Sequence, residues 1–243
     1  MEVWGLTDTG NVREQNQDAY RIERLSENAL LAVVCDGMGG ARSGNVASRL
    51  ASEVFSEEVK RSFSAEHTPQ EAERMLRSAA SLANIAVFEQ SQLSEEYSGM
   101  GTTLVAALIY EKAALVLNIG DSRAYLINAD GVTCVTTDHS VVELMVQRGE
   151  LTPEQAKNHP SKNLITRAVG TGKQVFADVF CVSAVKGDCF LLCTDGLSNL
   201  MADQEILFEV VHGARKDDCC QRLLEIAKER GAPDNVTSVL IAL

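Results

Sequence analysis

The sequence predicts a layered α+β fold built on antiparallel sheets. Short apolar runs rich in branched residues recur along the chain, two long helical patterns separate the first run from the second, and some neighbouring runs are spaced like hairpins. This order favours antiparallel sheets covered by helices over an array of βαβ units. No low-complexity tract, long linker or repeat marks a boundary, so we expect one domain over residues 1–243.

The predicted strands are apolar runs bounded by turn-forming residues. The second and third runs follow each other closely enough to pair as a hairpin, whereas Asp130-Gly131 is predicted to be an ordinary turn. The runs are Leu30–Cys35, Leu104–Ile109, Ala113–Ile119, Phe190–Cys193 and Val239–Leu243.

The predicted helices have recognisable starts. Thr68 can cap the second helix, Pro69 suits its first turn and Glu71 completes a capping box. The same logic at Thr152-Pro153-Glu154-Gln155 predicts a short helix that ends near Asn158. The other helical patterns are Val46–Arg61, Gln70–Gln90 and a last one that Asp217 opens and that runs through Arg230.

Composition limits the partners and the compartment. The formal charge of −12 and the pI of about 4.8 disfavour binding to nucleic acid or to anionic membranes. The N-terminus lacks the pattern of a secretory signal, and no apolar run reaches the roughly 20 residues that span a bilayer. The seven cysteines are scattered without a Cys-x-x-Cys pair, which favours reduced thiols in a cytoplasmic protein.

Aspartates stand beside the predicted strands. A single Asp-Gly pair is usually a turn, but neighbouring strands bring their ends together, and carboxylates that converge there repel each other unless a cation neutralises them. The pattern therefore predicts a metal site. The aspartates are Asp36, Asp121 and Asp195 after apolar runs, Asp234 before the last run, and Asp18 before Ala19-Tyr20.

The chemistry of the donors points to Mg²⁺ or Mn²⁺. All candidate ligands are hard oxygen donors, and no cysteine or histidine cluster accompanies them. Two such ions about 4 Å apart can share a carboxylate, activate a water and clamp a phosphoryl oxygen. Arg13, five positions before Asp18, offers a planar fork for two phosphate oxygens.

At these residues the chain resembles the metal-dependent protein phosphatases of type 2C, in their compact bacterial form. The matching stretches occur in the family's order and span nearly the whole chain. They are Thr7–Arg13 with Asn16–Asp18, Cys35–Gly40, Ser98–Thr103, Asn118–Arg123, His159-Pro160 through Leu164–Gly170, Thr194–Leu197 and Asp234–Thr237.

This resemblance implies a four-layer αββα sandwich with a metal centre at one end. Asp36 would bridge two metals, the Gly37 carbonyl would help to bind one, and Asp195 and Asp234 would complete the other. Asp18 would join this centre directly or through water, Asp121 with Asp195 would hold a third ion, and Arg13 would grip the phosphate. A hydroxide that bridges the metals would then hydrolyse phosphoserine or phosphothreonine in one step, without a covalent enzyme intermediate.

The resemblance also implies a mobile flap over residues 139–171 and phosphoprotein partners, including a serine/threonine kinase; we expect a monomer. Two positions depart from the family pattern. Gln17 occupies a position that is commonly acidic, and Met38 stands where many eukaryotic members carry a histidine thought to act as general acid. Methionine cannot donate a proton, so the leaving oxygen must take its proton elsewhere.

Several other functions are open to the same residues. A cysteine-based phosphatase would need five residues between its thiolate and its arginine, whereas six separate Cys35 from Arg42. A Walker loop would need lysine where Asn45 stands, and a dinucleotide fingerprint would need a small residue where Arg42 stands. A pseudophosphatase that binds phosphoproteins, or a partner-binding domain with solvated acidic turns, remains as an alternative of another class.

Overall fold

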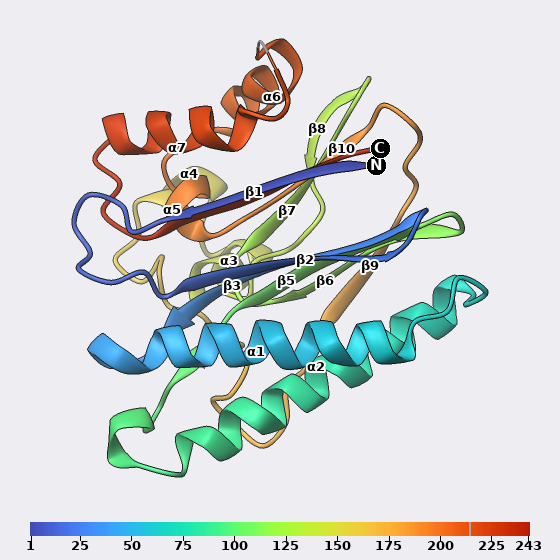
Figure 1. The fold of residues 1–243 in the computed structure, drawn as a ribbon. Helices are drawn as coiled ribbons and strands as arrows, with labels where there is room; N and C mark the ends of the chain where they lie inside the picture. The colour runs from blue at the N-terminus through green and yellow to red at the C-terminus, as the bar shows by residue number, and fades with distance from the viewer. Residues whose placement is uncertain (214) are drawn as a thin grey trace.

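The protein is a four-layer sandwich of two antiparallel sheets between two pairs of helices, as a computed structural model shows (Figure 1). The structure describes residues 1–213 and 215–243, without the side chains of residues 40–42, so Arg42 of the cysteine-loop hypothesis lies outside the described side chains. The predicted α+β class and the αββα arrangement that the resemblance implied are confirmed.

The first sheet contains both ends of the chain. Its strand order is β1-β11-β10-β7-β8, so the N-terminal strand pairs with the C-terminal one, from Glu2 opposite Ala242 to Asp8 opposite Val236. Its strands are β1 (Glu2–Asp8), β7 (Arg123–Asn128), β8 (Gly131–Cys134), β10 (Cys189–Cys193) and β11 (Val236–Ala242).

The second sheet has the order β2-β3-β5-β6-β9, with the short β4 paired to the end of β3. The predicted hairpin is confirmed, because β5 and β6 pair from Leu104 opposite Ile119 to Tyr110 opposite Ala113. Its strands are β2 (Asp18–Ser26), β3 (Ala29–Met38), β4 (Gly101–Thr102), β5 (Leu104–Tyr110), β6 (Ala113–Ile119) and β9 (Asp178–Val182).

Helices cover the outer faces of both sheets. In Figure 1, α1 (Gly40–Ser62) and α2 (Pro69–Ser91) lie along the second sheet, and α6 (Asp203–His212) and α7 (Cys219–Glu229) lie along the first. The capping boxes predicted at Thr68 and Thr152 are both present. The remaining short helices are η1 (Glu95–Tyr97), α3 (Val141–Gln147), α4 (Pro153–Lys157) and α5 (Asp195–Ser198).

Three apolar layers follow from the two-residue period of the strands. In β3, Leu31 and Val33 face the layer beneath α1 and α2, whereas Leu30 and Ala32 face the layer between the two sheets. The strands of the first sheet divide in the same way between the middle layer and the layer beneath α6 and α7. Successive residues of a strand therefore place their side chains in different layers.

Two strands are longer than predicted, because β3 continues to Met38 and β11 begins at Val236, and the starts of two predicted helices were wrong. The first helix begins at Gly40 rather than at Val46, because its first turn lacks apolar periodicity. The last helix begins at Cys219 rather than at Asp217; Asp218 precedes its first turn without a side-chain cap. Within the described residues, no helix is long and apolar enough to cross a membrane.

Candidate metal and phosphate site

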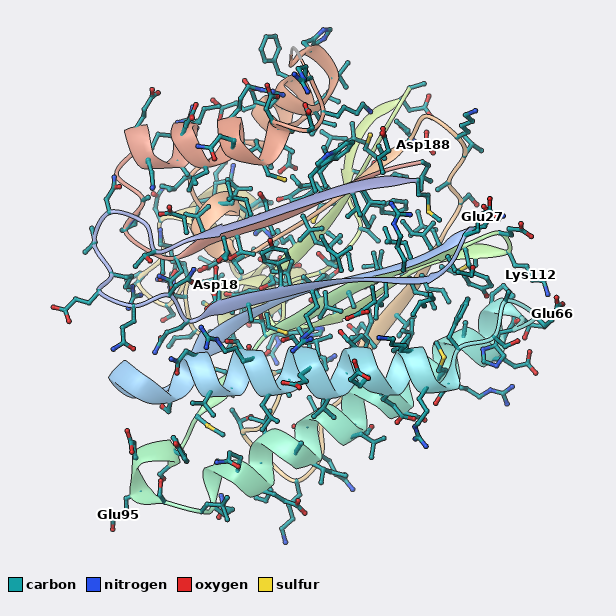
Figure 2. All side chains as sticks on the ribbon, in the orientation of Figure 1. Asp18, Glu27, Glu66, Glu95, Lys112 and Asp188 are labelled. Atoms are coloured by element: carbon teal, nitrogen blue, oxygen red, sulfur yellow. The ribbon has the colours of Figure 1, made fainter. Side chains whose placement is uncertain are left out.

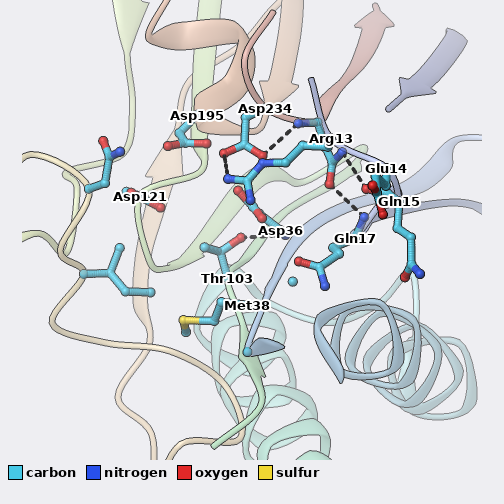
Figure 3. A pocket seen from close by; sticks show the side chains of 15 residues that line it. Arg13, Glu14, Gln15, Gln17, Asp36, Met38, Thr103, Asp121, Asp195 and Asp234 are labelled. Atoms are coloured by element: carbon cyan, nitrogen blue, oxygen red, sulfur yellow. Dashed lines mark hydrogen bonds and ion pairs between the residues drawn. The ribbon is translucent and has the colours of Figure 1, made fainter. Parts of the chain in front are cut away.

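A polar pocket of about 490 Å³ opens at one end of the sandwich (Figure 3). Four of the predicted aspartates line it together with Arg13, although they come from different parts of the chain. The lining consists of Arg13, Glu14, Gln15, Gln17, Asp36, Gly37, Met38, Gly39, Thr103, Asp121, Asn163, Ile165, Asp195, Asp234 and Asn235.

Asp36 enters the pocket from within β3, two residues before that strand ends at Met38. Cys35 and Asp36 point to opposite faces of the sheet, because side chains alternate along a strand. Cys35 is therefore fully buried in the layer beneath the helices, and this burial raises the pKa of its thiol. The hypothesis of a thiolate nucleophile loses its support, because a buried, protonated thiol attacks poorly.

Asp18 lies directly opposite Asp36 in the pairing of β2 with β3, but it is only 6 % exposed and does not line the pocket. Its Oδ2 accepts hydrogen bonds from the hydroxyls of Thr194, at 2.9 Å, and Thr237, at 2.7 Å. Its Oδ1 is buried and has no hydrogen-bond partner. A buried carboxylate oxygen without a partner lowers the stability of the folded state. Binding of a cation or a water to Oδ1 would remove this cost.

Two threonines hold the backbone of Asp36. The Asp36 N–H donates to Oγ1 of Thr103 at 2.9 Å, and the Asp36 carbonyl accepts from Oγ1 of Thr102 at 2.8 Å and from the Thr103 N–H at 2.9 Å. The Thr103 hydroxyl also lies 2.6 Å from that of Ser122, which follows Asp121. These bonds connect the segments that carry two of the pocket carboxylates.

The other three aspartates occupy the ends of their elements. Asp121 lies in the turn between β6 and β7, Asp195 begins α5 two residues after the last residue of β10, and Asp234 lies two residues before the start of β11. Gly37 is needed beside them because a Cβ there would stand 2.1 Å from the carbonyl oxygen of Gly44. Only glycine allows β3 and α1 to approach so closely.

Several carboxyl groups at the pocket have raised pKa values. Burial, followed by repulsion from neighbouring aspartates, raises the pKa of Asp121 to about 7 and that of Asp36 well above its usual range. Burial likewise raises the pKa of Asp18 to about 7. The pKa of Asp195 is also raised, first by burial and then by Asp234. Without a cation, this buried site therefore favours the neutral, protonated form of these carboxyls.

Arg13 supplies a positive charge at the rim. Its Nη2 donates to Oδ2 of Asp234 at 2.7 Å, and this hydrogen bond raises the pKa of the guanidinium. The Arg13 side chain is 53 % exposed, so the guanidinium faces the pocket opening and solvent. An exposed guanidinium at this position suits an incoming phosphate.

The residues fit a pair of hard divalent cations by their chemistry. Their donors are carboxylate and carbonyl oxygens, Oδ1 of Asp18 is a buried acceptor without a partner, and burial with mutual repulsion raises several carboxyl pKa values. Yet among the described residues no three Asp, Glu, His or Cys side chains form a ready-made cluster of ligands. The carboxylates therefore share a pocket without converging on one point.

The predicted flap segment borders this pocket. Asn163 and Ile165 line it, and backbone bridges join Ser140 to Ile165 and Thr102 to Val169. The thioether of Met38 faces the pocket, where it offers no proton to a leaving group.

Sequence reasoning assigned no role to three residues that hold the site. Thr103 fixes Asp36, as described above. The Asn235 side chain accepts from the Gln17 N–H and donates to the carbonyls of Thr9 and Gln15, so it holds the loop that carries Arg13. His139 contacts the turn before Asp121. Thr103 and Asn235 fall inside the quoted motifs, which was the only available signal.

The fold and the pocket together define a known class of protein. The sequence model of the protein phosphatase 2C family matches residues 11–240, nearly the whole chain. The chain therefore belongs to the protein phosphatase 2C family.

Individual relatives agree with this assignment. The chain is 35% identical over 236 residues to the serine/threonine phosphatase stp of Listeria monocytogenes, which covers 97% of this chain and 93% of that relative. It is 34% identical to the protein phosphatase PhpP of Streptococcus pneumoniae, over 100% of this chain and 98% of PhpP. The crystal structure of the serine/threonine phosphatase Stp1 from Staphylococcus aureus superposes with a TM-score of 0.89 at 39% identity, covering 100% of this chain and 94% of that one.

Proposed function

We propose that the chain is a metal-dependent protein phosphatase that hydrolyses phosphoserine and phosphothreonine. The observation that carries this proposal is the pocket in which Arg13 meets four carboxylates from separate elements. The family assignment supports the reaction class, and the relatives, which are named serine/threonine or protein phosphatases, support phosphorylated proteins as substrates.

The proposed cofactors are two Mn²⁺ or Mg²⁺ ions, with a third held more loosely. Asp36, the Gly37 carbonyl, Asp195 and Asp234 would hold the pair, and Asp18 would join them directly or through water. Asp121 with Asp195 would hold the third. When bound, such ions would supply water activation and stabilisation of charge on the phosphoryl oxygens.

The chain's own residues would orient the phosphate and the ligands. Arg13 would bind two phosphate oxygens through its planar fork, while its bond to Asp234 keeps it over the pocket before substrate arrives. Thr102 and Thr103 hold Asp36 at a fixed place in the pocket. Met38 cannot protonate the leaving alcohol, so that proton must come from water or from another group.

The remaining expectations are proposals of the same kind. Residues 1–243 would act as one monomeric catalytic domain, with residues 139–171 as a flap that influences the choice of substrate. A serine/threonine kinase would be among the phosphoprotein partners, and the compartment would be the cytoplasm. The acidic balance of the chain supports a partner other than nucleic acid.

Phosphate release from a phosphothreonine peptide tests the proposal. The assay is run with Mn²⁺, with Mg²⁺ and with EDTA on the wild type, Asp36→Asn and Cys35→Ser. We expect turnover that requires a divalent cation, is lost in Asp36→Asn and survives in Cys35→Ser. The loss should reach at least about 100-fold, because Asp36→Asn removes a ligand charge from both ions.

Other outcomes would identify the alternatives. Metal-independent turnover that disappears in Cys35→Ser would indicate a thiolate enzyme. Tight binding of the phosphopeptide without turnover would indicate a pseudophosphatase. Near-wild-type rates in Asp36→Asn would remove the metal assignment.

A further inference from the structure

His139 lies at the start of the flap segment, away from the pocket lining, and is only 6 % exposed. Its backbone joins two segments that border the site. The His139 N–H donates to the Gly120 carbonyl at 2.9 Å, and the His139 carbonyl accepts from the Thr166 N–H at 2.7 Å. The residue therefore links the turn before Asp121 with the part of the flap segment that contains Thr166.

The imidazole makes a second connection, from the same turn to strand β9. Its Nδ1 accepts the Gly120 N–H at 3.1 Å, and its Nε2 lies 3.0 Å from Oδ2 of Asp178 in β9. Because Nδ1 accepts, the neutral ring must carry its proton on Nε2 and donate it to Asp178. The two ring nitrogens thus have separate partners on opposite sides.

Arg167 of the flap completes this arrangement. Its Nη1 donates to Oδ1 of Asp178 at 2.9 Å and lies 3.1 Å from Nε2 of His139. Because Nε2 carries a proton, it cannot accept a hydrogen bond from Arg167. The Arg167 guanidinium therefore bonds Asp178 and not the imidazole. Asp178 therefore receives one hydrogen bond from His139 and one from the flap.

The turn that His139 contacts is tightly constrained. Gly120 has φ of +109°, and a Cβ there would stand 2.6 Å from Cγ2 of Thr103. The Asn118 side chain donates to the Gly120 carbonyl at 3.2 Å, and Ser122 is bonded to Thr103. The turn is thus held on one side by Thr103 and on the other by His139, with the Asp121 carboxylate facing the pocket between them.

We propose that His139 is a positioning residue with two arms. The Nδ1 arm fixes the Gly120–Asp121 turn. It thereby fixes the Asp121 carboxylate, which is proposed to bind the third cation. The Nε2 arm, through Asp178 and Arg167, fixes the flap that borders the substrate pocket. The first arm rests on the cation role proposed above for Asp121, and the second rests on the proposed phosphatase activity and flap but not on the third cation.

Two amide variants separate the arms, because each amide reproduces one end of the ring. Asn at position 139 can place its Oδ1 where Nδ1 accepts from Gly120, but it does not reach Asp178. Gln can donate to Asp178 from the place of Nε2, but it leaves the Gly120 N–H without its acceptor. Both remove the ring, so a general loss of packing should affect them alike.

Mn²⁺ titration by calorimetry and steady-state kinetics on a phosphothreonine peptide read out the two arms. We expect His139→Gln to weaken the weakest Mn²⁺ site at least about tenfold, as removal of a residue behind a metal ligand does, and to leave the tight sites unchanged. Asp121→Asn provides the reference for loss of that site. We expect His139→Asn to retain the weak site and to change KM for the peptide several-fold.

Asp178→Asn tests the flap arm at a side chain that is 42 % exposed, where loss of a charge should cost little stability, which a denaturation curve checks. It should reproduce the KM change of His139→Asn while leaving the Mn²⁺ titration as in the wild type. Equal effects of the Asn and Gln variants on both readouts, or an unchanged weak site in His139→Gln, would overturn the two-arm role. A wild type that neither binds Mn²⁺ nor cleaves the peptide would instead refute the proposed function.

Discussion

The Thr103 hydroxyl joins two parts of the site, because it accepts the Asp36 N–H and also bonds the Ser122 hydroxyl. Thr103 is 3 % exposed, so neither partner has ready access to water once the hydroxyl is removed. A buried polar group without a partner costs about 1–3 kcal/mol. Thr103 therefore contributes to the geometry of the pocket and to the stability of the fold.

Thr103→Val keeps the shape of this side chain and removes its hydroxyl. We expect the free energy of unfolding to fall by about 1–3 kcal/mol and kcat to fall at least about tenfold as Asp36 moves. Urea denaturation and steady-state kinetics measure the two effects. Thr103→Ser is the matched control, because it keeps the hydroxyl and should restore most of the activity. Full activity in Thr103→Val would contradict this role.

Arg13 is exposed, so its substitution should affect binding rather than folding. We expect Arg13→Ala to raise KM for a phosphopeptide about tenfold or more, with a smaller change in kcat, because the fork for two phosphate oxygens is lost. Arg13→Lys keeps the charge without the planar fork, so its KM should lie between those of the wild type and Arg13→Ala. The melting temperature should barely change, since exposed ion pairs contribute little. An unchanged KM would exclude the clamp.

At the scale of elements, the strands that the sequence predicted are buried on both faces, although β7, which is buried on both faces as well, was missed. The β5 and β6 runs are continuous apolar segments because each strand contacts an apolar layer on either side. By contrast, β1 and β2 are only partly buried and mix apolar with charged residues, so no apolar run revealed them. Helices α3 and α6 were missed as well; α6 has no capping side chain at Ala202.

The candidate site, too, could be predicted from the sequence only in part. The aspartates could be predicted because charged residues next to apolar runs are visible in the sequence, and the fold does bring four of them to one pocket. Thr103 and His139 could not be assigned roles, because they act through hydrogen bonds to backbone groups distant in sequence. Such bonds depend on strand register, which composition and periodicity do not specify.

The start of α2 offers a test of element stability away from the site. Thr68 and Glu71 form a reciprocal capping box, and Glu66 nearby lies at the end of the molecule opposite Asp18 in Figure 2. We expect Thr68→Ala to lower the free energy of unfolding by about 1 kcal/mol while kcat and KM stay unchanged. Denaturation curves and the peptide assay measure these effects. Thr68→Ser should behave like the wild type, and a loss of activity without a loss of stability would contradict the prediction.

For the whole molecule, we expect the gathering of carboxylates at one end to make stability depend on pH and on cations. Without metal, the pKa values of Asp18 and Asp121 rise from 3.8 to about 7 in the folded chain. Between these values the folded state keeps protons that the unfolded state has already released. Stability of the metal-free protein from these groups must therefore fall as pH rises from about 4 to about 7, and the loss is complete above that.

Cations should reverse this trend, because they bind the ionised carboxylates and compete with protons. In EDTA we expect the melting temperature to fall between pH 5.5 and pH 8, and saturating Mn²⁺ to raise it more at pH 8 than at pH 6. Each kcal/mol corresponds to about 2–4 °C for a chain of this size. Asp121→Asn removes one of the shifted groups and should flatten the EDTA profile. If Mn²⁺ stabilised the protein equally at both pH values, the aspartates of this pocket would not be the groups that bind it.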